Sequence, residues 1–170
     1  MIASVLILIH DEDLPHIKNC LSSIINQKFT EFEIVIIDDS EKEENLKYFE
    51  NLKSNNINIK YFKFQEKMSL PDARNLGISK CVGKYVFLQD SDDWSQPNRI
   101  EIQVKYLENG VDICCGLTNY FNSKSQYIFT SKQKKELKRI DDKNIIHNNH
   151  VAIGSVAFKR DIFSQEYEIF

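Results

Sequence analysis

Apolar residues along this chain gather in short runs that do not alternate with polar ones. Residues 5–9 (VLILI) and 34–37 (IVII) are rich in β-branched side chains. Such runs are typical of strands buried on both faces of a parallel sheet. Residues 85–88 and 111–115 predict further strands of this kind. Residues 57–64 alternate enough to predict a strand nearer the sheet edge.

Between these runs, apolar residues recur every three or four positions, which predicts amphipathic helices. We expect helices after Pro15, over residues 43–53, over residues 69–80 and after Pro97. Gly83 is expected to close the third of them by adopting a positive φ. Strands alternating with helices through right-handed crossovers predict an α/β fold with an open, mostly parallel central sheet.

The later part of the chain has a weaker pattern. Residues 119–149 are polar and rich in lysine and asparagine, and they predict no clear element. Residues 151–158 resume the strand pattern with Gly154 inside it. At 170 residues, the chain is expected to form one domain around one core.

Polar residues follow three of the predicted strands. Sheets of this class bind ligands at the carboxyl ends of their strands, so these residues form a candidate site. They are His10 and Asp11 after the first strand, Asp38 and Asp39 after the second, and Asp90, Asp92 and Asp93 after the fourth. Three carboxylates within residues 90–93 repel one another unless a cation or many donors lie among them, which suggests a metal site. The alternative is a solvated acidic turn.

The chemistry of these ligands narrows the candidate function. Carboxylate oxygens favour Mg²⁺ or Mn²⁺ over zinc, and such ions share substrate phosphates. The expected ligand is therefore a nucleotide or its sugar diphosphate, with Arg74 as a further phosphate contact. Neither a G-x-x-x-x-G-K-[ST] loop nor a G-x-G-x-x-G motif occurs, which argues against a P-loop NTPase or a Rossmann dehydrogenase.

Net charge, cysteine spacing and the length of the apolar runs argue against several other classes of protein. A net charge of −3 gives no electrostatic case for nucleic-acid binding, and the basic run 132–139 is interpreted as a solvated helix face. The four cysteines show no C-x-x-C spacing and are expected to be reduced core thiols of a cytoplasmic protein. The run 5–9 is too short to span a bilayer, although the protein could work as a peripheral protein at the inner face of the membrane.

Four blocks in order resemble the nucleotide-binding half of a family 2 glycosyltransferase with the GT-A fold. The blocks are ASVLILIHD, FEIVIIDDS, PDARNLGI and GKYVFLQDSDDWSQPNR, and the last two are the most specific. The resemblance covers roughly residues 3–163. It implies a three-layer α/β/α fold and metal-dependent, inverting transfer of a hexosyl or N-acetylhexosaminyl group from a nucleotide-diphosphate sugar. A UDP-sugar is the expected donor, and a polysaccharide, glycolipid or similar glycan is the expected acceptor of a bacterial enzyme.

The resemblance also implies roles for single positions in the first two blocks. Asp39 would accept a hydrogen bond from the base of the donor nucleotide. Ile9, His10 and Asp11 would line the same pocket. The first block ends LIHD where the family commonly has PTYN, and a glycine usually follows the paired aspartates. These departures leave the identity of the nucleotide open.

The later blocks carry the implied contacts to the rest of the donor. Asp90 would lie by the ribose, Asp92 would bind Mn²⁺ or Mg²⁺, and Asp93 would support it. Arg74 would face the diphosphate or stabilise the acidic loop. Trp94 is interpreted as a packing residue rather than a sugar platform.

Alternatives remain for single residues. Asp38 and Asp39 could cap the next helix, and Arg74 could be a surface ion-pair partner. His147 and His150 have a spacing that metal ligands use, but no further ligand lies near them in the sequence.

The catalytic base is not evident in these residues. The family continues after a segment like 151–163 to an acidic E-D pair that supplies the base, so we expect the base beyond Phe170. Glu166 and Glu168 do not occupy that setting. The chain is therefore expected to be a GT-A domain without its acceptor and base segment. The alternative is a non-catalytic sugar-nucleotide-binding module or a remnant of such an enzyme. A nucleotidyltransferase would need a glycine- and lysine-rich loop after the first strand, and residues 10–14 do not form one.

Overall fold

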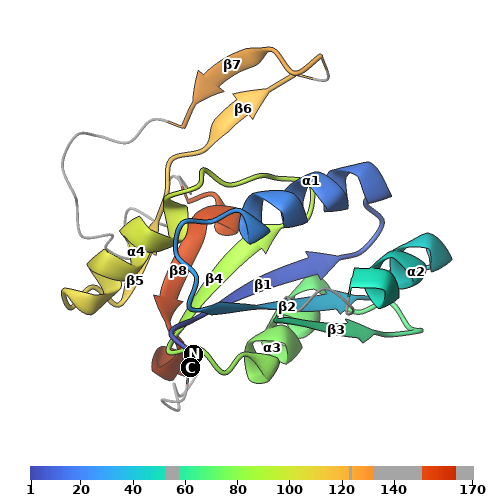
Figure 1. Cartoon of the computed structure of the whole chain (residues 1–170), viewed down its shortest axis with the longest axis horizontal. Coiled ribbons are helices and arrows are strands. Elements are labelled where there is room, and N and C mark those ends of the chain that lie inside the picture. Colours follow the sequence, from blue (N-terminus) through green and yellow to red (C-terminus); the bar gives the residue numbers. More distant parts are fainter. Residues whose placement is uncertain (53–57, 123, 132–150, 164–170) are drawn as a thin grey trace.

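A six-stranded sheet with the order β3-β2-β1-β4-β8-β5 forms the centre of the computed structural model, which describes residues 1–52, 58–122, 124–131 and 151–163 (Figure 1). The first four strands in this order are parallel, and β8 runs antiparallel to both of its neighbours. Their bounds are β1 Ala3–Ile9, β2 Phe32–Asp38, β3 Ile59–Lys63, β4 Tyr85–Asp90, β5 Ile113–Cys115 and β8 Val156–Lys159. The predicted mostly parallel sheet is confirmed, and β3 lies at an edge as expected.

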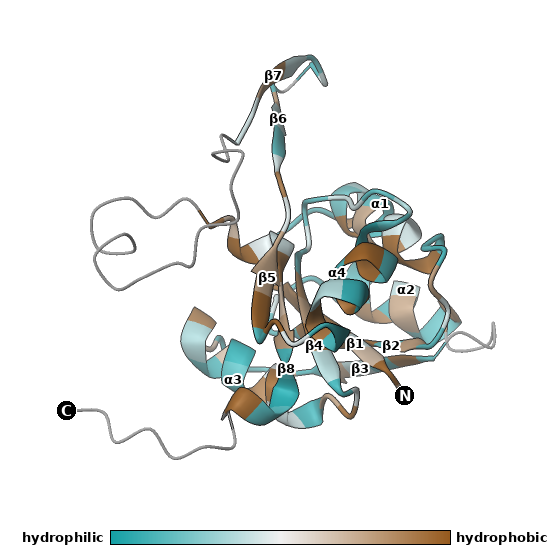
Figure 2. Cartoon of the chain, turned by 90° about the vertical axis from the view of Figure 1, so that its left-hand side faces the viewer, coloured by the Kyte–Doolittle hydropathy of each residue, from teal (hydrophilic) through white to brown (hydrophobic). Residues whose placement is uncertain are grey.

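Helices cover both faces of this sheet, as Figure 2 shows nearly edge-on. Three of them lie on one face and α3 lies on the other. Their bounds are α1 Leu14–Ile25, α2 Glu43–Leu52, α3 Leu70–Lys80 and α4 Arg99–Glu108. The three-layer α/β/α arrangement expected from the sequence is therefore present.

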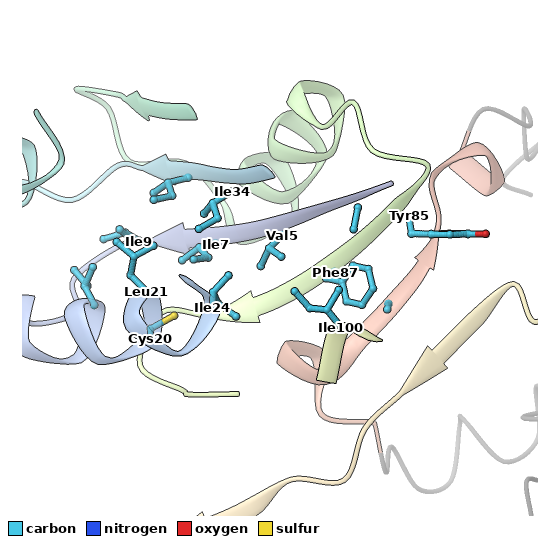
Figure 3. Close-up of a cluster of buried hydrophobic side chains, with 14 of the residues drawn as sticks. Val5, Ile7, Ile9, Cys20, Leu21, Ile24, Ile34, Tyr85, Phe87 and Ile100 are labelled. Atoms are coloured by element: carbon cyan, nitrogen blue, oxygen red, sulfur yellow. The ribbon is translucent and has the colours of Figure 1, made fainter. Parts of the chain in front are cut away.

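The non-alternating apolar runs follow from this layering. In β1, Val5 and Ile7 pack in the cluster formed with α1, α2 and α4, and Figure 3 shows both side chains in close-up. Leu6 points to the opposite face and packs with Ala73 of α3. Both faces of the strand are dry, so both sets of side chains must be apolar. Full burial of a side chain of this size contributes about 1.5–3 kcal/mol.

Gly83 has a different role from the one predicted. Among the described residues, the only glycine with a positive φ is Gly110 (φ 96°), after α4. Gly83 instead lies against β1, where a Cβ atom would come within 2.5 Å of the Ala3 carbonyl carbon. Its N–H donates to Ser4 Oγ at 2.8 Å. A glycine is needed here because the backbones approach closely, and the prediction of a positive φ was wrong.

Several predicted elements have different bounds, and the last helix and strand show it most clearly. The helix expected after Pro97 begins at Arg99. The strand expected over residues 151–158 is only Val156–Lys159, because Ile153–Ser155 forms a 3₁₀ helix, η2, that contains Gly154. A second 3₁₀ helix, η3 (Arg160–Phe163), follows.

A hairpin occupies part of the segment that predicted no element. Strands β6 (Asn119–Phe121) and β7 (Tyr127–Thr130) pair with each other in a separate two-stranded sheet. Figures 1 and 2 show this hairpin extending away from the central sheet. The basic run 132–139 and the two histidines at 147 and 150 lie outside the described residues. In the part of the chain that the structure describes, no helix is long and apolar enough to cross a bilayer.

Candidate functional site

The register of the sheet brings the predicted site residues to one edge. Ile9 pairs with Asp38 across β1 and β2, and Leu8 pairs with Asp90 across β1 and β4. All three strands are parallel, so their carboxyl ends lie side by side. The loops that follow them carry His10, Asp39, Asp92 and Asp93, and Asp90 is the last residue of β4.

Asp39 connects three of the segments at this edge. Its Oδ1 lies 2.8 Å from His10 Nδ1, and its Oδ2 accepts the backbone N–H of Met68 at 2.7 Å. Its own N–H donates to the Ile9 carbonyl at 3.1 Å. Helix α2 begins only at Glu43, so Asp39 does not cap it. The carboxylate is held between β1, β2 and the segment before α3.

Asp38 has a separate, internal environment. Its side chain is fully buried and accepts hydrogen bonds from Tyr61 Oη at 2.6 Å and from Lys63 Nζ at 3.0 Å. Its Oδ1 also accepts from Ser40 Oγ at 2.7 Å. Burial and the Asp38 carboxylate raise the pKa of Tyr61. Asp38 therefore joins β2 to β3, and its carboxylate is not available to a ligand.

The residues after β1 divide between the site and the core. Asp11 is exposed, and Lys67 Nζ lies 2.9 Å from its Oδ2. This hydrogen bond from Lys67 lowers the pKa of Asp11. The side chain of Ile9 is only 1% exposed and packs in the core (Figure 3). Contrary to the prediction from the sequence, this side chain does not line the site. Its backbone carbonyl reaches the site, where Asp39 uses it.

The acidic loop after β4 concentrates negative charge. Burial of the carboxyl group, followed by the charge of Asp92, raises the pKa of Asp90 and also that of Asp93. The charge of Arg74 lowers the pKa of Asp90, so its guanidinium group lies near the acidic loop. The N–H of Gly154 also donates to the Asp90 carboxylate.

This loop has the ligand chemistry that a hard divalent cation prefers. In the described segments, no three side chains of His, Cys, Asp or Glu form a ready-made metal cluster. Burial first, and then repulsion between the carboxylates, raise the pKa of Asp90 and of Asp93, and the nearby arginines oppose this shift only in part. A cation with oxygen ligands would relieve this repulsion, so the residues fit Mn²⁺ or Mg²⁺.

Arg99, which the sequence analysis did not single out, lies beneath the acidic loop. Its Nη2 donates to the Leu88 carbonyl at 2.8 Å, and its Nη1 donates to Gln89 Oε1 at 2.7 Å. Its Nε donates to Gln103 Oε1 at 3.0 Å. Burial lowers the pKa of Arg99 to about 10, so the guanidinium still carries its charge at neutral pH. The signal in the sequence that could have identified Arg99 is a single arginine at the start of the helix that follows the acidic residues.

Trp94 lies at the outer side of the same loop. It is 53% exposed, and its ring centroid is 5.8 Å from that of Phe121 in the hairpin. Trp94 therefore packs against Phe121 of β6 and does not fill the core.

Similarity to known sequences agrees with this arrangement. The family model described as Glycosyl transferase family 2 matches residues 4–166. Glycosyltransferase GlyA of Streptococcus pneumoniae is 32% identical over 108 residues, which are 63% of this chain and 15% of that protein. The amylovoran biosynthesis glycosyltransferase AmsE of Erwinia amylovora is 27% identical over 168 residues, or 93% of this chain and 60% of that protein. The chain thus spans less than two thirds of the length of either relative.

Solved structures share the fold. TarS of S. aureus in complex with UDP-GlcNAc aligns with a TM-score of 0.76 at 21% identity, over 96% of this chain and 47% of that one. The mannosyltransferase PcManGT from Pyrobaculum calidifontis, in complex with GDP-Man and Mn²⁺, aligns with a TM-score of 0.68 at 16% identity, over 95% of this chain and 45% of that one. The fold is that of the GT-A glycosyltransferases, and with the family model covering nearly all of its length the chain belongs to glycosyl transferase family 2.

Proposed function

We propose that this chain is the donor-binding part of a metal-dependent, inverting glycosyltransferase. The observation that carries the proposal is the register that gathers Asp39, Asp90 and Asp92 at the carboxyl edge of the sheet. The substrate would be a nucleoside-diphosphate sugar, because a hydrogen-bond acceptor for the base and a carboxylate-bound cation for the diphosphate match two of its parts. Family membership and the AmsE relative support its use in polysaccharide or glycolipid synthesis.

The residue roles follow the order of the segments along the sheet edge. Asp39 would accept from the nucleotide base, with His10 and Asp11 beside it. Asp90 would lie by the ribose, and Arg74 would face the diphosphate. Asp92, with its exposed carboxylate, would bind Mn²⁺ or Mg²⁺. The metal would offset the charge that develops on the diphosphate as it leaves.

A UDP-sugar is the proposed donor, with a hexosyl or N-acetylhexosaminyl group to transfer. TarS was solved with UDP-GlcNAc and PcManGT with GDP-Man, so a nucleoside diphosphate is the shared chemistry of these neighbours. We place the reaction in the cytoplasm, at the inner face of the membrane where a glycolipid acceptor would lie. The four free cysteines support a reducing compartment.

Thermal unfolding tests the proposal directly. UDP should raise the melting temperature only when Mn²⁺ or Mg²⁺ is present, because the cation joins the diphosphate to the acidic loop. Asp92→Asn should remove that increase, and Glu108→Gln, which removes an exposed charge at the far end of α4, should retain it. An increase that needs no metal and survives Asp92→Asn would refute the site.

Release of UDP from UDP-GlcNAc separates the enzyme from a binding module. Inversion requires a base to deprotonate the acceptor hydroxyl, and no described residue is assigned that role. Turnover at about 1 per second or faster would identify this chain as the enzyme and show that it contains its own base. UDP binding without turnover would favour the sugar-nucleotide-binding module.

A further inference from the structure

A group of three exposed aromatic rings borders the acidic loop and has no part in the donor site described above. The ring centroids of Trp94 and Phe121 are 5.8 Å apart, and those of Phe121 and Tyr127 are 6.1 Å apart. Trp94 is 53% exposed, Phe121 40% and Tyr127 59%. We call these three residues the aromatic surface.

The aromatic surface does not belong to the packing of the core. Phe121 and Tyr127 lie on the β6–β7 hairpin, which extends away from the central sheet (Figure 1). None of the three rings is part of either buried cluster among the described residues. Contiguous exposed apolar groups of this kind mark interaction sites more often than single exposed side chains do.

The aromatic surface lies next to the place where the proposed sugar transfer would occur. Trp94 follows Asp92 by two residues in the same loop, so the aromatic surface adjoins the proposed metal and diphosphate end of the donor. The acceptor must come close to this part of the site, because its hydroxyl group attacks the anomeric carbon that is bonded to the diphosphate, from the face opposite the leaving group. Building on the proposed function, we propose that the aromatic surface binds the sugar rings of a neutral acceptor glycan composed of hexose or N-acetylhexosamine units.

The chemistry of the hairpin matches such a ligand. A pyranose ring presents apolar C–H groups on its faces and hydroxyl groups at its edges, so it stacks on aromatic side chains beside polar groups. Tyr127 Oη lies 2.9 Å from Thr130 Oγ1, which donates to Asn119 Oδ1 at 2.6 Å. These uncharged polar groups lie on the strands that carry two of the three rings.

The charge of the hairpin favours a neutral glycan over an anionic membrane. Lys124 is the only charged residue within positions 117–131. Attraction to anionic lipid amounts to about 1 kcal/mol for each basic residue near the surface, so one lysine provides little of it. A negatively charged partner would need more basic residues than this segment holds.

Trp94 allows a direct test because it is the only tryptophan of the chain. The 170-residue protein is titrated separately with chitohexaose, cellohexaose and maltohexaose, up to about 10 mM to detect weak binding. We expect at least one hexasaccharide to shift the tryptophan emission to shorter wavelength and to protect it from acrylamide, with saturation. No response to any of the three would overturn the proposal. The same holds for a response only to phosphatidylglycerol vesicles, or only to rising protein concentration, which would indicate a membrane surface or a second copy.

Two neighbouring substitutions provide the matched control. Phe121→Leu keeps the apolar character but removes the ring that joins Trp94 to Tyr127, and it should weaken hexasaccharide binding about tenfold. Tyr120→Leu should leave binding unchanged, because the Tyr120 ring stacks instead on Phe129 at 4.5 Å. Equal effects of the two variants would overturn the assignment.

The donor site provides an independent readout. Phe121→Leu should retain the increase in melting temperature caused by UDP with Mn²⁺, and Asp92→Asn should retain hexasaccharide binding. Loss of the nucleotide response alone would refute the proposed function and leave the sugar-binding surface. Absence of the hexasaccharide response with the nucleotide response intact would refute the inference alone.

Discussion

Gly154 and Asp90 lie so close together that a side chain at position 154 would collide with the first carboxylate of the acidic loop. A Cβ atom on Gly154 would be 2.5 Å from Asp90 Oδ2 and 2.7 Å from its Cγ. The N–H of Gly154 also donates to this carboxylate. The 3₁₀ helix before β8 therefore sets the orientation of Asp90.

Gly154→Ala should displace Asp90 and weaken the binding of UDP with Mn²⁺ about tenfold, since the new methyl group occupies the place of the carboxylate. Forcing a methylene into a packed site destabilises a protein by about 1–3 kcal/mol. Isothermal titration and urea unfolding measure the two effects. Gly116→Ala is the control, because its Cβ would meet only Ser155 Cβ at an ordinary 3.7 Å. Equal losses in both variants would contradict the proposed contact.

Replacing Arg99 should affect both stability and metal binding. Arg99→Met removes the donors to the Leu88 carbonyl and to Gln103 Oε1, which should lower the free energy of unfolding by about 1–3 kcal/mol for each buried acceptor that loses its partner. Gln89 Oε1 keeps the hydrogen bond from Ser95 Oγ. It also removes a positive charge that lowers the pKa of Asp90 and Asp93, so Mn²⁺ should bind more weakly at slightly acidic pH.

Lys105→Met on the same helix is the control for Arg99. Lys105 is exposed, and its ion pair with Glu101 at 2.8 Å has the i,i+4 spacing that contributes about 0.3–0.5 kcal/mol. Urea unfolding and Mn²⁺ titration of both variants distinguish the buried from the surface cation. If both variants lost a similar small amount of stability and of Mn²⁺ affinity, Arg99 would not stabilise the acidic loop.

Glu33 should make the stability of the fold depend on pH. Burial opposes its ionisation, but hydrogen bonds from Lys60, Ser4 and the Val82 N–H outweigh that effect and lower its pKa below the ordinary 4.5. The folded state therefore binds protons less readily than the unfolded state at acidic pH. The stabilisation from Glu33 is fully present above pH 4.5 and is lost as the pH falls through the lowered pKa.

Urea unfolding of Glu33→Gln at several pH values checks this expectation. The variant should lose about 1–3 kcal/mol at pH 7, where the buried donors lose their charged acceptor, and less near pH 3. Glu31→Gln, which changes an exposed carboxylate two residues earlier, should follow the wild-type pH profile. A loss that is the same at both pH values would refute the role of the Glu33 charge.

The sequence predicted the features that follow from local patterning. Apolar runs such as residues 34–37 identify strands that are dry on both faces, and the acidic residues directly after them fall at one edge because parallel strands share a direction. Residue patterning was therefore enough to infer the mostly parallel sheet and the positions of Asp39 and Asp90 at its edge, whereas the three layers were implied by the family resemblance.

The remaining features depend on contacts between distant segments. Gly83 is needed because its backbone touches β1, and Gly154 because it touches Asp90, and neither contact has a signal in the residues nearby. Arg99 looks like an ordinary helical cation until its carbonyl acceptor in β4 is seen. The hairpin was missed because its aromatic residues are exposed, so its strands lack the apolar and polar alternation that burial on one face imposes.

The pair formed by His10 and Asp39 leads to a prediction that separates the two ends of the donor site. Asp39→Asn keeps one oxygen for the Met68 N–H and can donate its amide to a neutral His10, so the fold should survive. The carboxylate proposed to receive the base is lost, so UDP should bind about tenfold more weakly.

Binding of Mn²⁺ measured without nucleotide should not change in Asp39→Asn, because burial, neighbouring carboxylates and nearby arginines shift the pKa of Asp90 and of Asp93, and Asp39 is not among the causes. Glu41→Gln, an exposed carboxylate in the same loop as Asp39, is the control and should leave both affinities intact. Asp92→Asn should give the opposite result, with metal binding lost. If Asp39→Asn weakened Mn²⁺ binding as much as UDP binding, Asp39 would belong to the metal site, and the assignment of the base to the β2 side of the sheet would be wrong.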